Sequence, residues 1–544
     1  MKPLTDWGKR QNRRGRFKLA FRVWRWWKKL EFVVRSRWER LIAPAVSRWG
    51  LALRPNWGNG HYILGKALRQ RYSLLSNLKS SDPKRMAQTS WSDIEEVGNQ
   101  ACAHLRKVLE IDPERLEVYP ELWNILFALG KTDEASIVLQ QSDELKRQIS
   151  VARQEDQLDL RFVSPQCLGT MGILGHLINY IKAGLLGWRP PGKLVMLVSD
   201  DTQIANPCFL DYWRQYLTLI TDPETIDTLS PMASHLEEPL SWGFSCNGQA
   251  LFYPTAANLV ANQWDIENRP PLMTLSTSDY KRGWKCLEDL GVPRDAWFVC
   301  LHVRDGGFYG EGDNRESYRN ADIESYVMAI ETIVAHGGWV IRMGDPNMKP
   351  LSPMDQVIDY AHSDVHTDWM DVFLAAQCRF FIGTSSGLAA LPIAFGVLCV
   401  HTNYLPWVGM HFSGKDLFIP RMIWSTNESR LITFPEIMSS SLGQGADQCS
   451  YDRLGVEILE NKPEEINDVV SEMLMRLDGK ISYTESDEQL QTRLRSLTSA
   501  CAIGPNKVMI NARIGREFLR KYAALLDAPP RTADDFQNQA NIQV

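Results

Sequence analysis

The sequence has few of the features that mark membrane, secreted or zinc-binding proteins. No apolar run in its 544 residues approaches the about 18 to 20 residues that a membrane-spanning helix needs, and no apolar signal segment follows the basic start. The ten cysteines include no C-x-x-C pair and no cysteine and histidine cluster with zinc-ligand spacing. These absences predict a reduced, cytoplasmic protein that neither spans a membrane nor is secreted.

Length and composition indicate a multidomain globular protein. A chain of 544 residues exceeds the about 250 to 300 residues at which a single hydrophobic core stops growing. With 44% hydrophobic and 23% charged residues, the chain is neither fibrous nor largely disordered. Two or three folded domains are therefore expected.

The charge is distributed unevenly. Residues 1–50 hold fifteen Lys and Arg against Asp6, Glu31 and Glu39, although the whole chain has a formal net charge of -5. Residues 9–40 mix this charge with tryptophan and phenylalanine at roughly helical spacing, which predicts a peripheral helix on the anionic, cytoplasmic face of an inner membrane. The alternative is a basic helix docked on the acidic remainder of the chain. Nucleic acid is not expected as a partner, because no nucleic-acid-binding motif follows.

A helical region is expected at residues 51–150, which lack the β-branched runs of strands. Its segment ACAHLRKVLEIDPERLEVYPELWNILFALGKTDEASIVLQQ resembles tetratricopeptide repeats. The matching positions are Ala101, Leu105 and Pro113 in one unit, and Trp123, Leu126, Gly130, Ala135 and Leu139 in the next. Such units bury their faces only against neighbours, so they either bind a protein partner or an acceptor, or buttress the rest of the chain.

Beyond residue 154 short apolar strands alternate with helical stretches, which predicts an α/β fold with parallel sheets. The expected strands are 160–163, 194–199, 297–303, 339–343, 379–382 and 397–401. Two Rossmann-like domains, at 155–280 and 281–480, would bind a ligand in the crevice outside the carboxyl ends of their strands. A helical segment at 481–530 is expected to pack back on this body.

The first half carries a glycine-rich loop in SPQCLGTMGILGHLINYIKAGLLG, before a helix expected to begin near Ile173. Gly172 lets a ligand approach the backbone, and the helix N-terminus offers free N–H groups. His176 lies in the first turn of that helix, and an imidazole there suits a general base for an acceptor hydroxyl. The alternative is a packed, hydrogen-bonded histidine.

The strongest pattern lies in WFVCLHVRDGGFYGEGDNRESYRNADIESY, where an apolar strand ends in a polar cluster and a long loop leads to a helix capped near Asn320. Strands buried on both faces rarely end in such a cluster merely to satisfy the fold. The residues able to grip a diphosphate by paired hydrogen bonds are Arg304, Arg315 and Arg319, with a surface charge as the alternative for the last two. Asp305 or Asp313 would act as a base or orient a sugar.

Two further strands repeat this arrangement. One ends at Arg342, and the other follows a helix capped by Asp368 and leads into G-T-S-S-G at residues 383–387 before a second helix. Small hydroxyl residues at a helix N-terminus after a parallel strand suit a diphosphate. An ordinary N-cap would explain one serine but not the whole turn.

These residues resemble those of the GT-B glycosyltransferases. The segment G-T-S-S-G-L-A-A-L is similar to the donor-phosphate loop in the C-terminal domain of that fold, and His302-Val303-Arg304 resembles the H-x-R element of GDP-fucose-using fucosyltransferases. The run from His302 through Asn403, with the later ENKPEEINDVVSEMLMRL, resembles a family of bacterial glycosyltransferases of surface-carbohydrate gene clusters. The likeness covers roughly residues 160 to 525. Asp305 stands where fucosyltransferases commonly carry a basic residue, so fucose is not implied.

The resemblance implies a GT-B fold, a nucleotide-diphosphate sugar as donor, and transfer to a glycan, lipid-linked or protein acceptor in polysaccharide biosynthesis, with no obligatory metal and no required cofactor. No D-x-D motif follows a strand, since Asp200 and Asp201 are adjacent. The predicted catalytic residues are His176, Asp305 and Asp313, and the predicted donor-binding residues are Gly172, His302, Arg304, Arg319, Arg342, Gly383, Thr384, Ser385, Ser386 and Gly387. The alternatives are a noncatalytic scaffold with a degenerate body, and a nucleotide-sugar epimerase, which would need neither an acceptor site nor a membrane-directed arm.

Overall fold

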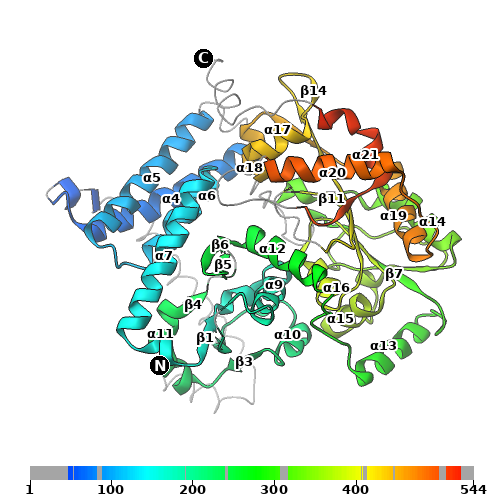
Figure 1. The fold of residues 1–544 in the computed structure, drawn as a ribbon, viewed down its shortest axis with the longest axis horizontal. Coiled ribbons are helices and arrows are strands. Elements are labelled where there is room, and N and C mark those ends of the chain that lie inside the picture. The colour runs from blue at the N-terminus through cyan, green and yellow to red at the C-terminus, as the bar shows by residue number, and fades with distance from the viewer. Residues whose placement is uncertain are drawn as a thin grey trace, which may run out of the picture. The chain divides into compact units, whose positions relative to one another are not determined.

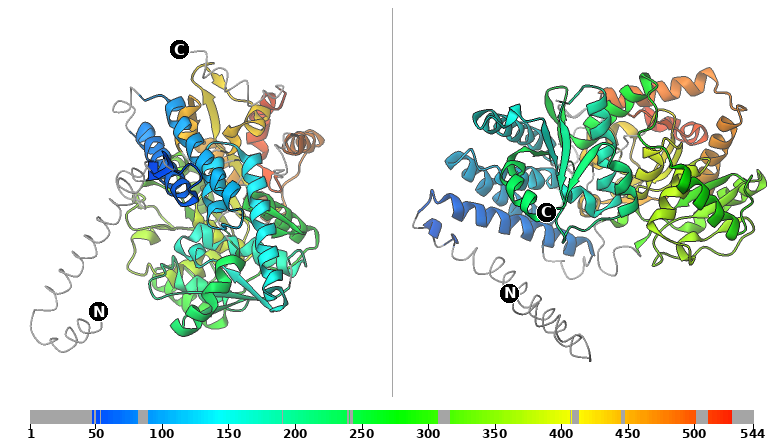
Figure 2. Two further views of the ribbon diagram at one scale, coloured as in Figure 1. Left: turned by 90° about the vertical axis from the view of Figure 1, so that its left-hand side faces the viewer. Right: turned by 90° about the horizontal axis from the view of Figure 1, so that it is seen from below.

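The computed structural model describes residues 47–48, 50–52, 54–81, 89–189, 191–238, 240, 243–306, 316–405, 407, 413–444, 448–500 and 510–527 (Figure 1, Figure 2). The chain divides into two compact units: a helical unit that ends inside helix α6, and an α/β unit that continues from Leu126. The predicted amphipathic arm at residues 9–40 lies outside the described residues. Within the described part, no helix combines the length and the apolarity needed to cross a bilayer.

The described part of the helical unit contains most of α4 (Gly58–Ser81), all of α5 (Trp91–Ile111) and most of α6 (Val118–Ala128). A capping box starts α5, because the side chains of Ser90 and Asp93 each accept a hydrogen bond from the other's backbone N–H. Ala101 and Leu105, which the sequence pattern places on an inner face, are fully buried. The predicted helical region is therefore confirmed, while its division into tetratricopeptide-like repeats stays a prediction.

The α/β unit begins with α7 (Thr132–Ala152), which packs against strand β6, and continues into a four-stranded sheet. All pairings in this sheet are parallel, in the order β3-β2-β1-β4. Its elements are β1 (Leu160–Val163), α8 (Met171–Leu174), α9 (His176–Leu185), β2 (Lys193–Leu197), α10 (Pro207–Trp213), β3 (Leu217–Ile220), α11 (Pro223–Leu236), β4 (Glu237–Glu238), the hairpin β5 (Gly243–Cys246) and β6 (Gln249–Phe252), and α12 (Tyr253–Ile266). Val163 and Met196 face a core shared with α9, α10 and α12, whereas Phe162 and Val195 face α11.

A seven-stranded sheet follows, again parallel throughout, in the order β16-β12-β11-β10-β7-β8-β9. Its strands are β7 (Phe298–His302), β8 (Trp339–Arg342), β9 (Val357–Ile358), β10 (Phe381–Gly383), β11 (Cys399–Tyr404), β12 (Leu417–Pro420) and β16 (Arg513–Ile514). The helices around it are α13 (Thr277–Asp289), α14 (Val327–Ala335), α15 (Asp368–Gln377), α16 (Ala390–Ala394), α19 (Pro463–Leu477), α20 (Glu485–Ala500) and α21 (Arg516–Lys521). Val299 and Leu301 pack on the side of α14 and α19, and Phe298 and Cys300 on the side of α13 and α15, so helices cover both faces (Figure 1).

A small antiparallel sheet, in the order β14-β13-β15, completes the α/β unit. Its strands and the nearby helices are β13 (Met422–Ser425), β14 (Arg430–Leu431), α17 (Phe434–Ser439), α18 (Gln448–Arg453) and β15 (Val456–Leu459). Two parallel sheets with covering helices, preceded by a helical region, confirm the predicted α/β fold class, while its assignment to the GT-B type stays a prediction. The strand expected at 160–163 is present with those bounds, and the other five expected strands are present with ends shifted by at most three residues. The remaining strands of the two parallel sheets, β3, β4, β9, β12 and β16, were not expected.

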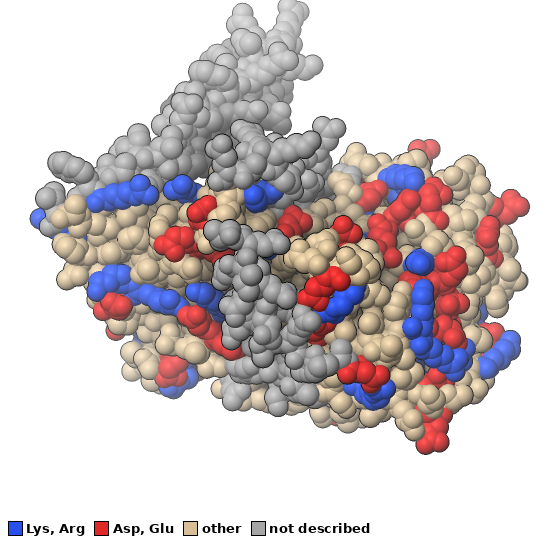
Figure 3. Space-filling model, turned by 90° about the horizontal axis from the view of Figure 1, so that it is seen from above, with Lys and Arg blue, Asp and Glu red and all other residues tan. Residues whose placement is uncertain are grey.

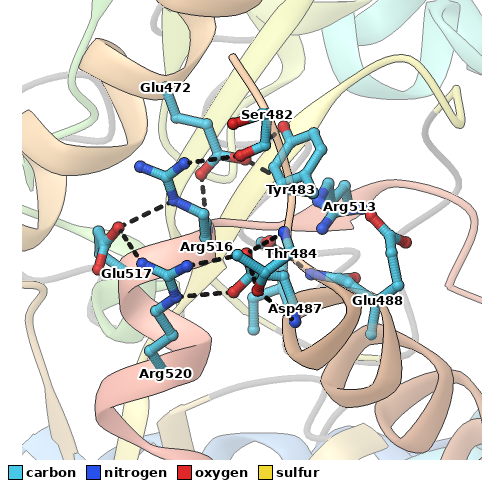
Figure 4. Close-up of polar contacts among 12 residues, drawn as sticks. Glu472, Ser482, Tyr483, Thr484, Asp487, Glu488, Arg513, Arg516, Glu517 and Arg520 are labelled. Carbon is cyan, nitrogen blue, oxygen red and sulfur yellow. Dashed lines mark hydrogen bonds and ion pairs between the residues drawn. The ribbon is translucent and has the colours of Figure 1, made fainter.

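The C-terminal segment closes on the seven-stranded sheet through α20, β16 and α21 (Figure 4). Arg520 forms a two-pronged ion pair with Asp487, at 2.7 and 2.8 Å. Arg513, on β16, lies 3.5 Å from the centre of the Tyr483 ring. An ion pair therefore joins α21 to α20, and a cation–π contact joins the edge strand β16 to the segment just before α20.

Charges of both signs are interspersed over the described surface on the face in Figure 3. Lys and Arg lie beside Asp and Glu across this face, rather than in separate fields. The acidic side chains on this face therefore have basic neighbours and form no separate negative surface.

Two helix starts differ from the prediction. The helix expected to be capped near Asn320 is preceded by a 3-10 turn that Asp322 caps, and α15 is capped by Thr367, with Asp368 as its first residue. In both cases the capping side-chain oxygen accepts a backbone N–H from the first turn, which leaves Asn320 available for other contacts.

Candidate functional site

Polar residues follow three strands of the seven-stranded sheet at its carboxyl edge. Arg304 lies two residues beyond β7, Thr384 directly follows β10, and Arg421 directly follows β12. These strands are parallel, so their carboxyl ends meet at one edge of the sheet. The residues that follow β7, β10, β11 and β12 form the candidate site.

His302 ties two of these strand ends together. Its buried ring donates from Nδ1 to the Met343 carbonyl at 3.2 Å and accepts at Nε2 from the Ser386 hydroxyl at 2.9 Å. The pKa of His302 is lowered to about 4, chiefly by burial, with a contribution from the positive charges of Arg342 and Arg304. The ring is therefore neutral at pH 7 and positions Ser386.

The G-T-S-S-G loop at residues 383–387 joins neighbouring strand ends through its hydroxyl groups. Thr384 accepts the Arg304 backbone N–H at 3.0 Å, and Ser385 accepts the Leu405 N–H at 3.0 Å. A 3-10 turn at Gly387–Ala389 and the short α16 follow, in place of one helix beginning at the loop. The loop therefore aligns the ends of β7, β10 and β11.

Arg304 lies where the sequence predicts, at the end of β7, with 7% of its surface exposed. Its guanidinium donates from Nη1 to the Glu316 carbonyl at 2.8 Å and to the side-chain oxygen of Asn320. Its backbone carbonyl accepts the Ala321 N–H at 2.9 Å. These contacts hold the segment around Asn320 against the carboxyl edge of the sheet.

Arg421 is a second buried arginine at this edge and was not predicted from the sequence. Its guanidinium donates to the backbone carbonyl of Asn320, and 3% of the residue is exposed. Arg304 and Arg421 thus converge on one residue from strands that β10 and β11 separate. The sequence signal was LFIPR at residues 417–421, a short apolar run that ends in an arginine, as the run before Arg304 does.

Other polar groups of the β7 loop contact the chain itself. Arg319 forms an ion pair with Glu316 at 2.5 Å, and Asp305 accepts the Lys349 N–H at 2.7 Å. The residues of this prediction that lie outside the described residues are Asp313 and Arg315. The functional roles assigned to these side chains stay predictions.

Arg342 is enclosed by the chain at the end of β8, with 1% of its surface exposed. It donates from Nη1 to Asp359 at 3.1 Å and from Nη2 to the Lys349 carbonyl at 2.8 Å. The bond to Lys349 joins the end of β8 to the loop before β9, and the bond to Asp359 joins it to the residue that directly follows β9. Contact of Arg342 with a donor stays a prediction.

His176 begins α9, beside the four-stranded sheet, after Gly175 interrupts the single helix expected from Ile173. Its Nδ1 donates to the Leu240 carbonyl at 2.9 Å, and its ring stacks on Tyr253 with the ring centres 3.5 Å apart. This hydrogen bond selects the tautomer in which Nε2 would accept a proton. The ring is packed and hydrogen-bonded, and its use as a base stays a prediction.

The two glycine-rich loops pack against each other. A Cβ atom on Gly387 would lie 2.2 Å from the Gly172 nitrogen and 2.7 Å from its Cα atom, which no backbone tolerates. A Cβ atom on Gly172 would meet the Cα atom of Gly387 at 3.4 Å, at the tight end of ordinary contact. Gly387 therefore permits a close approach between backbone segments that follow β1 and β10.

Asp371, in the first turn of α15, is a largely buried carboxyl group, with 15% of its side chain exposed. Burial raises the pKa of Asp371 to about 7, although the Tyr360 hydroxyl opposes the rise, and the nearby Asp368 adds to it.

In the part of the chain that the structure describes, no group of three or more histidine, cysteine or acidic side chains could hold a metal ion.

Replacing Asp371 with asparagine is expected to remove part of the pH dependence of stability. Its pKa is raised from 3.8 to about 7, so its stabilising contribution is complete below about pH 4 and is lost as the pH rises through 7. Urea unfolding should show the wild type losing up to about 1.4 kcal/mol per pH unit relative to Asp371→Asn across this window. Asp364→Asn, an exposed change nearby, is the control, and identical profiles for the wild type and Asp371→Asn would contradict the assignment.

No protein-family model and no curated protein matches the chain. Among solved structures, the glycosyl transferase family 9 protein from Veillonella parvula is similar over 48% of this chain and 85% of its own, with 10% identity and a TM-score of 0.32. ADP-heptose LPS heptosyltransferase II of E. coli matches 48% of this chain and 90% of its own, with 11% identity and a TM-score of 0.29. The iron-containing dodecameric glycosyltransferase TibC of enterotoxigenic E. coli matches 47% of this chain and 61% of its own, with 16% identity and a TM-score of 0.27. Sequence identities and TM-scores as low as these do not assign a function to this chain.

Proposed function

We propose that the chain is a glycosyltransferase that takes a sugar from a nucleoside-diphosphate sugar. The observation that carries this proposal is the buried Arg304 at the carboxyl end of β7, bonded to the hydroxyl loop of residues 383–387. A guanidinium in a site with little water stabilises the negative charge that builds up on a leaving diphosphate. The donor is therefore assigned to the carboxyl edge of the seven-stranded sheet.

The acceptor is assigned to the side of the four-stranded sheet. A base removes the proton from the acceptor hydroxyl, whose oxygen bonds to the anomeric carbon while the bond from that carbon to the phosphate oxygen breaks. His176 is the proposed base, because its Nδ1 donates to the Leu240 carbonyl and this hydrogen bond selects the tautomer that carries no proton on Nε2. Asp305, a half-buried carboxylate beside Arg304, is the alternative.

The remaining parts of the proposal concern the setting of the reaction. We assign the acceptor to the glycans, lipid-linked sugars or proteins of surface polysaccharide synthesis, and the basic residues 1–50 to contact with an anionic membrane. The helical unit is assigned to a protein partner or to the acceptor. Arginine charge takes the place of a metal ion at the diphosphate, so no metal is required.

A thermal-shift series against nucleoside-diphosphate sugars tests this function. One nucleotide at 100 times its dissociation constant should stabilise the protein by about 2.7 kcal/mol, in EDTA as well as in magnesium or manganese. The matching nucleoside monophosphate is the control, and release of nucleoside diphosphate with an acceptor is the activity readout. Absence of any nucleotide-dependent shift would reject the proposal, and a shift that requires a metal would reject only its metal-free part.

A further inference from the structure

Arg421 is a buried cation with few partners. Among the described residues, its guanidinium makes one hydrogen bond, which Nη2 donates to the Asn320 carbonyl. Its Nε atom is buried and has no hydrogen-bond partner among these residues. A guanidinium carries five N–H donors, and burying such a group without matching acceptors is costly. The side chain therefore lies in a place where an added anion would satisfy it.

The carboxylate nearest to Arg421 is a weak counter-ion. Glu460 Oε1 lies 4.0 Å from Arg421 Nη2, and 41% of the Glu460 side chain is exposed. The other oxygen of Glu460 accepts the Asp322 N–H at 3.1 Å, which holds the carboxylate at the rim of the site. A carboxylate that is itself exposed to water and 4.0 Å away contributes little to the pair, so a stronger anion would displace Glu460 from the arginine.

Arg421 does not stand alone at this place. Asn320 accepts Arg421 at its backbone oxygen and Arg304 at its side-chain oxygen, so two guanidinium groups meet around one residue. Burial lowers the pKa of Arg421, and the charge of Arg304 lowers it further against the attraction of Glu460. Two like charges held together in a buried place favour a ligand with two adjacent negative groups.

We infer that Arg421 and Arg304 form a two-arginine anion site around Asn320 that takes a diphosphate, with Glu460 as the resident counter-ion that the diphosphate displaces. This inference rests on the proposed function for the identity of the group attached to the diphosphate. Arg421, which directly follows β12, is then a second arginine that binds the donor, and Glu460 is a carboxylate that competes with the diphosphate. A single phosphoryl group neutralises one arginine, so orthophosphate binds more weakly than pyrophosphate.

Titration calorimetry of the full chain with pyrophosphate and with orthophosphate tests the site. Arg421→Gln should lower the affinity for pyrophosphate about tenfold or more. The variant should therefore prefer pyrophosphate over orthophosphate less strongly than the wild type does. Arg379→Gln is the matched control, because Arg379 pairs with Asp478 at 2.7 Å at the other end of the sheet, just before β10. It should leave pyrophosphate binding unchanged.

Glu460→Gln tests the same site without altering an arginine, and it serves if Arg421→Gln fails to fold. Removing the competing carboxylate should raise the affinity for pyrophosphate severalfold. Glu324→Gln is the control, since Glu324 is also an exposed acidic residue and pairs with Lys349 at 3.5 Å. It should have no such effect.

The outcomes separate this inference from the proposed function. Absence of pyrophosphate binding by the wild type, or unchanged affinity in both folded Arg421→Gln and Glu460→Gln, overturns the two-arginine site. If a nucleoside-diphosphate sugar binds to Arg421→Gln as well as it binds to the wild type, the proposed function stands without the two-arginine site. If pyrophosphate binding follows the predicted pattern and no nucleoside-diphosphate sugar binds, the anion site stands and the proposed function fails.

Discussion

Alanine in place of Gly387 is expected to destabilise the α/β unit by about 3 kcal/mol. The added Cβ atom would lie 2.2 Å from the Gly172 nitrogen and 3.0 Å from the Met171 carbonyl carbon, and these backbone atoms cannot turn aside as a side chain can. The segments after β1 and β10 would have to separate, and the buried contacts beside them would be lost. Chemical denaturation of the purified variant measures the loss.

Two matched glycine changes sharpen this prediction. Gly172→Ala, on the other side of the same contact, places its Cβ atom 3.4 Å from Gly387 and should cost far less. Gly169→Ala, in the same loop, meets no atom within 4 Å and should change stability by at most about 0.5 kcal/mol. Equal effects of Gly387→Ala and Gly172→Ala would show that the loops do not pack as described. If Gly387→Ala kept full stability but lost nucleotide binding, the glycine would serve the ligand.

Arg304→Ala is expected to weaken nucleoside-diphosphate binding about tenfold or more, because it removes charge-assisted hydrogen bonds worth on the order of 1.5 to 3 kcal/mol. The hydrogen bonds from its side chain to the Glu316 carbonyl and to Asn320 would also be lost. The protein should still fold, since the bond from the Arg304 backbone N–H to Thr384 is independent of the side chain. Calorimetry measures the affinity, and thermal unfolding measures the folded state.

Lysine at position 304 should recover only part of the affinity. An ammonium group retains the charge but cannot make the planar, two-pronged contact of a guanidinium with a diphosphate. A sharp loss of thermal stability in Arg304→Ala, with unchanged affinity in the folded fraction, would contradict the assignment. In that case Arg304 would serve to anchor the segment around Asn320, and the donor site would lie elsewhere.

Local patterns in the sequence predicted much of the candidate site. The apolar run before His302 and Arg304 identified a buried strand with a polar end, and the G-T-S-S-G loop after β10 identified a second strand end. Each of these patterns depends on residues close together in the chain. The same reasoning missed Arg421, because the short apolar run LFIP at residues 417–420 ends in a proline, which counts against a central strand.

The sequence by itself determined the alternation of strands and helices, the helical region before it, and the polar residues that end or directly follow β7, β8 and β10. These follow from hydrophobic periodicity and from capping and turn residues, which act over a few neighbours. The tertiary structure alone decided that Arg342 bonds to Asp359 within the chain and that Arg421 meets Arg304 at Asn320. It also decided that Gly387 faces Gly172. The order of strands and the packing of loops bring such residues together over long stretches of chain, and no local pattern encodes that order.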